Sequence, residues 1–337
     1  MSTQVETPAD LAGGTYKATI REKAAELKRE LIRQTLDDIE SWRKAVDLEW
    51  AQAHPEQPAH SPIPPAEIEG YKNTVRNEYY EWVEPAFEKY LEPDPDGTNG
   101  MIAALRTIES SFQGSQDDAG SFSGASPALS RINDVRTDMA QWQGDLQTNF
   151  IDNFLTPLQS ASINQAAVAK IAREQLECNK VIYIRYRKGI LELVKQAIEA
   201  VKTLNNNKDP KSFEWGTIVV AVAGAALAAV PGAGWVAAGA VLTITATIAE
   251  GLVPEPPKKH DLGAPTAQEV AVKVAEGMSK MDADIFEEER KVKAAFESIL
   301  EGVSNARREG GPLSVPEPAL SSARPGEITD GSLRPHD

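Results

Sequence analysis

Residues 216–249 form a long stretch of the 337-residue chain without a single charged side chain. The stretch reads GTIVVAVAGAALAAVPGAGWVAAGAVLTITATIA, and Pro231, Gly232 and Gly234 supply the chemistry of a turn near its middle. This turn divides the stretch into two apolar arms, 216–230 and 235–249. We call the stretch the apolar segment.

Two interpretations of the apolar segment remain open. In the first, both arms are helices enclosed in a bundle, because a helix that is apolar on every side suits a protein core. In the second, the arms form a membrane hairpin that is stored in the soluble protein and released on contact with lipid. Each arm would rise about 22 Å as a helix, which is less than the ~30 Å hydrocarbon core of a bilayer.

Three features favour the membrane interpretation. The segment is longer than one core helix needs, its recurring glycines and alanines allow close helix approach in lipid, and Trp215 and Trp235 begin the two arms. The β-branched ends, 217–220 and 241–247, are equally compatible with a β-tongue. The other residues expected to contact lipid are Ile218, Val219, Val222, Leu227, Val241, Leu242 and Ile244.

Outside the apolar segment, apolar residues recur at steps of three and four, as in amphipathic helices. This spacing predicts helices over 16–52, 66–90, 101–112, 127–142, 145–204 with an interruption near Pro157, and 267–307. Breaks rich in proline or polar residues separate these helices, and 113–126 has the composition of a flexible loop. The pattern predicts an all-α fold, an elongated antiparallel bundle of long helices, and no strand pattern competes with it.

The breaks divide the chain into six expected parts. They are a flexible N-terminus (1–15), an N-terminal helical pair (16–92), a helical hairpin (98–205), the apolar segment (216–249), a C-terminal helix that packs on the bundle (267–307) and a disordered tail (309–337).

The net charge of −15 repels phosphate backbones, so nucleic acid is not an expected partner. The single cysteine, Cys178, excludes an intrachain disulfide and is expected to be a small apolar residue on a helix. Residues 1–14 lack the basic and apolar regions of a secretory signal peptide. If the protein leaves the cell, we expect a route that does not use such a peptide.

No pattern of catalytic or metal-binding residues is present, so we expect neither an enzyme nor a cofactor. The histidines fall in breaks or in the tail and are interpreted as solvated: His54, His60, His260 and His336. The sequence has no Gly-Lys-Ser/Thr phosphate loop and no Gly-x-Ser-x-Gly elbow. The basic cluster of Arg185, Arg187 and Lys188 is interpreted as a solvated helix face rather than a site for an anion.

A helix corner is predicted at Trp142-Gln143-Gly144, where the glycine permits a tight turn and the next helix presents Phe150 and Phe154 on one face. This arrangement resembles the Trp-x-Gly family of small helical-hairpin proteins that type VII (ESX) secretion systems export. The resemblance covers about 98–205. It implies that the protein is a secretion substrate and that it has a secretion partner.

Substrates of that system carry a Tyr-x-x-x-Asp/Glu export signal after the second helix of the hairpin. No such pattern follows Gly144 here. The pattern occurs upstream, at Tyr80 and Glu84 and at Tyr90 and Asp94, and the second pair is the candidate signal. Otherwise the signal would lie on a partner protein.

The layout also resembles the α-helical pore-forming toxins of the cytolysin A and haemolysin BL type, which carry one apolar tongue between long helices. The resemblance implies a secreted, non-enzymatic protein that oligomerises through its helical faces and inserts the apolar segment into a membrane. The alternative function is an assembly scaffold, which also oligomerises but keeps the apolar segment permanently in its core.

Overall fold

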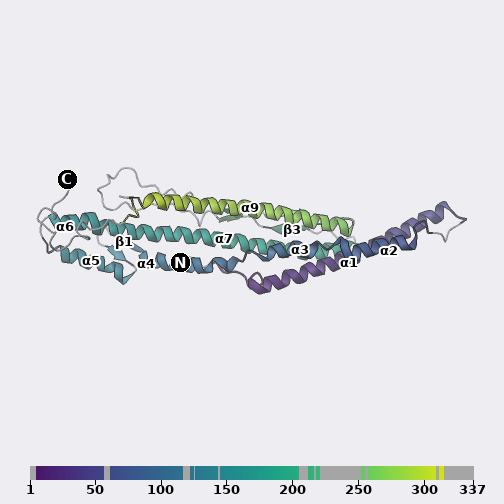
Figure 1. Cartoon of the computed structure of the whole chain (residues 1–337), viewed down its shortest axis with the longest axis horizontal. Helices are drawn as coiled ribbons and strands as arrows, with labels where there is room; N and C mark the ends of the chain where they lie inside the picture. Colours follow the sequence, from purple (N-terminus) through teal and green to yellow (C-terminus); the bar gives the residue numbers. More distant parts are fainter. Residues whose placement is uncertain are drawn as a thin grey trace. The chain divides into compact units, whose positions relative to one another are not determined.

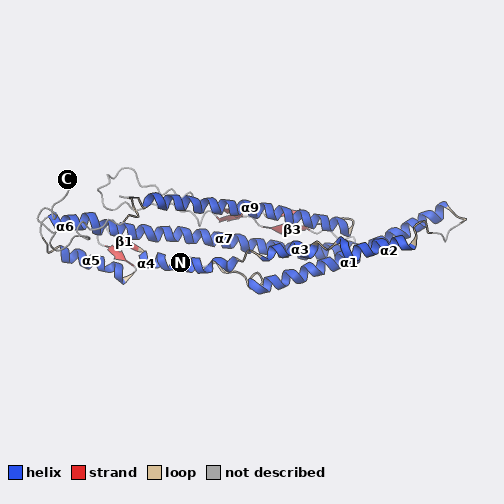
Figure 2. Cartoon of the chain, viewed as in Figure 1, coloured by secondary structure: helices blue, strands red, loops and turns tan. Residues whose placement is uncertain are grey.

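In the residues that it describes, the computed structural model of this chain is an all-α helical bundle with a few short strands (Figure 2). The predicted fold class is therefore confirmed. The structure describes residues 5–56, 61–116, 122–124, 126–142, 145–204, 212–215, 218–220, 252–254, 257–308 and 311–314.

The helices are labelled in Figure 1, and most lie close to the ranges that the apolar spacing predicts. The single helix predicted over 66–90 is instead divided into shorter helical pieces, with a turn at 80–82. The α-helices are α1 (Gly13–Ala53), α2 (Pro65–Thr74), α3 (Val83–Glu88), α4 (Asn99–Phe112), α5 (Pro127–Met139), α6 (Asp145–Phe150), α7 (Thr156–Thr203) and α9 (Ala267–Ala306). The shorter turns are the π-helical η1 (Val75–Tyr79) and η4 (Ile151–Leu155) and the 3₁₀-helical η2 (Lys89–Leu91) and η3 (Pro95–Thr98).

The interruption expected near Pro157 takes the form of a π-helical turn. The backbone N–H of Thr156 bonds to the carbonyl of Ile151, five residues earlier, and the Thr156 hydroxyl donates to the same carbonyl at 2.9 Å. Proline has no N–H, so a regular helix would lose one bond here in any case. The missing hydrogen bond therefore falls at the π-helical turn η4, between α6 and α7.

Short strands occupy the predicted loop at 113–126 and the breaks on either side of the apolar segment, so those predictions were wrong. One further strand, at 218–220, lies inside the apolar segment, where a β-tongue was left open. The strands are β1 (Gly114–Gln116), β2 (Phe122–Gly124), β3 (Ser212–Trp215), β4 (Ile218–Val220), β5 (Leu252–Pro254) and β6 (Lys258–Asp261). They form three two-stranded sheets, β1 with β2, β3 with β6 and β4 with β5. Strands of three or four residues are too short to show an alternating pattern, and β1, β2 and β5 also contain a glycine or a proline, which indicates a turn.

The chain forms two compact units. The first consists of Met1–Gly97, Lys180–Val219 and Pro254–Glu289, and the second of Thr98–Asn179, Val220–Val253 and Arg290–Asp337. The core of the first unit joins the N-terminal half of α1 with α3, the C-terminal part of α7, strand β3 and the N-terminal part of α9. Its fully buried side chains include Tyr16, Leu27, Phe87, Ile190 and Val274.

Arg187 lies in the core of the first unit, where the sequence predicted a solvated helix face. Its guanidinium donates to the carbonyl of Leu11 at 2.8 Å and to that of Leu91 at 3.1 Å, and it lies 3.3 Å from the carboxylate of Asp94. It also stacks over the ring of Tyr16, 4.6 Å from the centroid. The prediction was wrong for Arg187, because long-range carbonyl groups replace water around the charge.

The second unit has a smaller apolar core and a buried ion-pair cluster. Ile132 and Leu155 are buried in this core, and Phe150 and Phe154 pack against them. The guanidinium of Arg173 on α7 binds the carboxylates of Glu109 at 2.8 Å and Glu177 at 2.9 Å.

Candidate functional site

The candidate site is the base of the apolar segment, formed by strands β3 and β6 in the first unit. β3 precedes the segment and β6 follows it, and the two pair in antiparallel fashion with Phe213 opposite His260 and Trp215 opposite Lys258. β4 and β5 also pair. Both ends of the apolar segment are thereby held together. We call the β3–β6 pair the base ribbon.

Of the residues predicted to contact lipid, Trp215 lies in β3 and Ile218 and Val219 lie in β4. The others lie outside the described residues: Val222, Leu227, Pro231, Gly232, Gly234, Trp235, Val241, Leu242 and Ile244. The choice between a helical hairpin and a β-tongue therefore stays open for them, while the described flanks on both sides are strands.

Alternation along β3 turns two aromatic rings into the core. Phe213 and Trp215 are 1% and 7% exposed, while Glu214 between them faces solvent. This is the period of two that a strand imposes on its side chains. The two rings stack with centroids 5.1 Å apart, and the edge of His260 meets Phe213 at 5.9 Å. The base ribbon is thus docked through its aromatic face.

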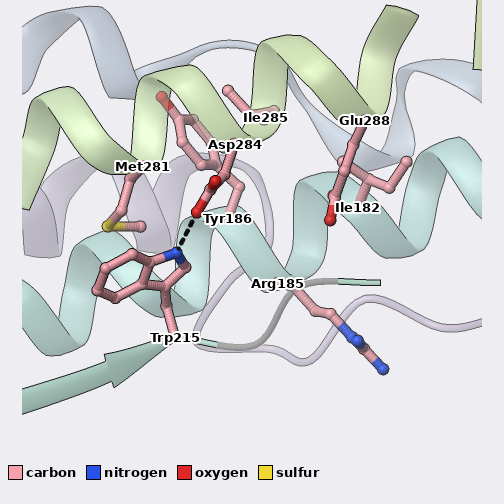
Figure 3. A pocket seen from close by; sticks show the side chains of 8 residues that line it. All are labelled: Ile182, Arg185, Tyr186, Trp215, Met281, Asp284, Ile285 and Glu288. Carbon is pink, nitrogen blue, oxygen red and sulfur yellow. Dashed lines mark hydrogen bonds between the residues drawn. The ribbon is translucent and has the colours of Figure 1, made fainter. Parts of the chain in front are cut away.

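Trp215 also makes the polar contact that ties the ribbon to α9. Figure 3 shows its indole reaching Asp284, and the N–H donates to Oδ2 of that carboxylate at 2.9 Å. Lys258 of β6 donates to the other oxygen, Oδ1, at 2.6 Å. One carboxylate on α9 therefore binds both strands. Trp215, predicted as a membrane anchor, lies against the bundle in this structure.

Two helix glycines make room for the ribbon. A Cβ atom built on Gly277 of α9 would lie 3.1 Å from the ring of Phe213 and 3.2 Å from that of His260. A Cβ atom on Gly189 of α7 would lie 3.3 Å from Cβ of Trp215 and 2.5 Å from the terminal methyl of Met281. The sequence analysis did not identify either glycine, although a glycine inside a helical pattern indicates a close approach.

His260 was interpreted as solvated, and that interpretation was wrong. It is 7% exposed on β6, where its Nε2 lies 2.9 Å from the carbonyl of Lys273 and its Nδ1 lies 3.1 Å from Nζ of Lys280. Lys273 itself donates to the carbonyl of Gly263 and lies 3.5 Å from Asp261. The pKa of Asp261 is lowered, chiefly by the backbone N–H of Gly263 and then by Lys273.

A pocket beside Trp215 holds about 300 Å³ of empty space, part of it open solvent. Figure 3 shows its lining from α7, β3 and α9, with Arg185 pointing away from the other side chains. The neighbouring Tyr186 donates to Asp282 at 2.8 Å, and burial followed by this bond raises its pKa. Within the described ranges there is no group of three side chains suited to a metal ion.

The predicted helix corner lies in the second unit and is described only in part. Trp142, directly after α5, is 52% exposed, and Gly144 lies outside the described residues. Phe150 at the end of α6 and Phe154 in η4 face each other with ring centroids 5.1 Å apart. The structure therefore brings the two phenylalanines together in the small core.

The candidate export signal lies in the first unit, at η2 and the loop after it. Tyr90 is 1% exposed, and its ring meets that of Tyr186 edge-on at 5.6 Å. Asp94 forms the ion pair with Arg187 described above. A receptor would have to bind these two residues in a form in which Tyr90 is uncovered.

No helix among the described residues combines the length and the apolar character that crossing a membrane requires. No family model, no curated protein and no solved structure matches the chain.

Proposed function

We propose that this protein is a non-enzymatic helical-bundle protein whose apolar segment inserts into a lipid membrane, as a component of a pore-forming assembly. The observation that supports this proposal most is the base ribbon. Strands β3 and β6 hold both ends of an uncharged segment together and are themselves docked between α7 and α9.

The proposed mechanism is a switch between two burial sites for the apolar segment. Burial of apolar area contributes about 25 cal/mol per Å², so a segment of this size involves tens of kcal/mol in protein and in lipid alike. Only the difference between the two states decides which one is populated. A docked base then keeps the ends of the segment in place while its middle changes surroundings.

The proposal includes export by a type VII secretion system, on the basis of the Trp-x-Gly pattern. The exposed indole of Trp142 is in a position to contact a secretion partner. Since Tyr90 is buried, we propose that the export signal is supplied by that partner. Export of the protein from a cell that lacks the partner would contradict this part of the proposal.

The test of membrane insertion is dye release from anionic and from neutral liposomes by the purified full-length protein. We expect release by the wild type and at least a tenfold loss of release in Ala228→Asp and Ala238→Asp, because a carboxylate is costly in hydrocarbon. The matched control is Ala45→Asp at an exposed position of α1, which should release dye as the wild type does. Equal release by all three variants, or no release and no binding by a folded wild type, would refute insertion.

The second candidate function is an assembly scaffold, and the exposed surface of α1 and α2 favours it. The buried residues of α1 end at Gln34, although its apolar positions continue. Trp42 is 48% exposed, Leu48 is 60% exposed, and Tyr71 on α2 is 48% exposed. Amphipathic helix faces with exposed apolar residues are common at protein interfaces.

Sedimentation of the wild type and of the Trp42→Arg and Leu48→Glu variants tests the scaffold function. A wild-type oligomer that dissociates in both variants, together with a protein inert toward liposomes, would favour the scaffold. A monomeric wild type without lipid would count against it.

A further inference from the structure

The base ribbon is a sheet of two strands, so each strand has one outer edge. In an antiparallel pair, every second residue of a strand directs its N–H and C=O groups away from the partner strand. Among the described residues, β3 and β6 pair with each other and with no third strand. No backbone hydrogen bond joins 212–215 or 258–261 to another described element. Each edge of the base ribbon therefore offers backbone donors and acceptors to a further strand.

The packing of the base ribbon determines where a further strand can be added. Its inner face is covered, because Phe213, Trp215 and His260 are buried against the helices. Its outer face carries Glu214 and Lys259, which are exposed and lie opposite each other in register. A further strand can therefore join at an edge, in the plane of the sheet, while the ribbon stays docked on α7 and α9.

The outward-facing charges of the two strands favour one kind of edge pairing. When β3 of one copy lies beside β6 of a second copy, Glu214 meets the Lys259 of that copy, and opposite charges across strands attract. Pairing of β3 with β3 would place two glutamates together, and pairing of β6 with β6 would place two lysines together. The two edges of the base ribbon are thus complementary to each other rather than each to itself.

The same side chains select the register of this pairing. A shift by two residues would bring Asp261 of the second copy opposite Glu214, and like charges directly opposite each other are unfavourable. A shift by one residue would turn the outward residues of one strand toward the helices. The register that places Glu214 opposite Lys259 repeats between copies the pairing that each ribbon already has within itself.

We propose that the base ribbon joins copies of this chain, with β3 of one copy pairing edge to edge with β6 of the next. This inference rests on the proposed function, since it names the contact between copies in the pore-forming assembly. Such a head-to-tail contact repeats from copy to copy, and it closes into a ring when the rotation between copies divides a full turn. Closure leaves no free strand edge. All copies then have the same orientation, so their apolar segments leave the shared sheet in one direction.

Disulfide cross-linking between two cysteine variants tests this contact. Glu214→Cys and Lys259→Cys are mixed in equal amounts on phosphatidylcholine–phosphatidylglycerol liposomes and oxidised with copper phenanthroline. On a non-reducing gel we expect at least tenfold more dimer in the mixture than in either variant alone, because only β3 beside β6 brings the two positions together. The native Cys178 is buried and is the same in every sample.

The matched control is a mixture of Glu214→Cys with Lys44→Cys, whose cysteine is at an exposed position of α1. It should give no more dimer than the single variants. A mixture of Glu214→Cys and Lys259→Cys that gives no more dimer than this control would overturn the contact. Equal dimer in Glu214→Cys alone and in the mixture would also overturn it, since β3 would then pair with β3.

Charge reversal gives a second test, which does not depend on cysteine chemistry. Glu214→Lys and Lys259→Glu each place like charges opposite one another, within the ribbon and between copies, so each alone should release at least tenfold less dye than the wild type. An equimolar mixture restores opposite charges between alternating copies, although each ribbon keeps its own like-charged pair. We expect the mixture to release at least fivefold more dye than either variant alone. Release by the mixture that equals the mean of the two variants would contradict a contact between copies.

The two readouts separate failure of this contact from failure of the proposed function. Cross-linking in the mixture together with dye release by the wild type supports both. Cross-linking in the mixture without dye release by the folded wild type retains the contact and refutes insertion. Dye release without cross-linking in the mixture retains insertion and refutes the contact.

Discussion

Gly277 of α9 faces the ring of Phe213 so closely that a methyl group added to the glycine would lie 3.1 Å from Cε1 of the ring. Phe213 comes from β3, so this one glycine decides how near the base ribbon can approach the helix. The atoms within reach of the added group belong to the rings of Phe213 and His260, so both rings would have to shift by a few tenths of an ångström.

Gly277→Val should therefore weaken docking of the ribbon. Overpacking of a filled core costs about 1–3 kcal/mol, and we expect a loss of that size in the free energy of unfolding in urea. Gly70→Ala on α2 is the control, since nothing lies within 4 Å of the added atom, and it should gain about 0.5–1 kcal/mol from helix propensity. A Gly277→Val variant as stable as the wild type would show that the ribbon is not tightly packed on α9.

Arg187→Lys should destabilise the first unit strongly. An ammonium group cannot replace the planar guanidinium that reaches both the Leu11 and Leu91 carbonyls, so at least one buried carbonyl loses its donor. We expect a loss of about 2–4 kcal/mol by chemical denaturation. Lys188→Gln, at the next and exposed position of α7, should change stability by less than about 0.5 kcal/mol. Equal effects of the two substitutions would contradict the described role of Arg187.

Glu26 should make the stability of the first unit depend on pH. Its pKa is lowered from 4.5 to about 2, first by the bond from Lys202 and then by that from Lys23. A carboxyl with a lowered pKa in the folded state stabilises above its unfolded value and loses this contribution as the pH falls from 4.5 toward 2. Glu26→Gln should cost about 0.5–1 kcal/mol at pH 7, and the difference should shrink as the pH falls from about 5 to about 2. Thermal unfolding across this range measures it, and a constant difference would argue against the pairing.

Cys178 should resist thiol reagents in the folded protein. Burial, followed by the nearby Glu174 and Glu177, raises the pKa of its thiol to about 11. At pH 8 the thiolate fraction is then about 100-fold lower than for a free cysteine, so labelling should be at least that much slower than in denaturant. A cysteine introduced by Lys188→Cys should react quickly and serves as the reference. Fast labelling of Cys178 in the native protein would show that α7 opens locally.

The long helices could be predicted because their signal is repeated over many residues. Ile20, Ala24, Leu27 and Leu31 are spaced by three and four, and all four are buried in α1. The spacing in α9 is as regular, and the ends of the two helices fall within three residues of the predicted bounds. Repetition makes such predictions robust, since no single residue decides them.

The base ribbon could not be predicted in the same way. Each of its strands has four residues, and β6 reads Lys-Lys-His-Asp, which has the composition of a solvated loop. The burial of His260 comes from Phe213 and α9, which are distant in sequence. The neighbours of a residue in the sequence indicate which secondary structure it favours. They do not indicate whether an isolated polar side chain such as His260 is buried, because tertiary packing decides that.

The first unit is built from three separate pieces of the chain, and this has a consequence for synthesis on the ribosome. Leu11 and Leu91 are made 176 and 96 residues before the arginine that satisfies their carbonyls. At about 5–20 residues per second, the N-terminal helices emerge many seconds before their core can close. The apolar segment likewise emerges before α9, whose Asp284 and Lys280 bind its base. A nascent chain of this protein therefore passes through a stage in which strand β3 and the uncharged stretch after it have been made, but the helix that binds the base ribbon has not.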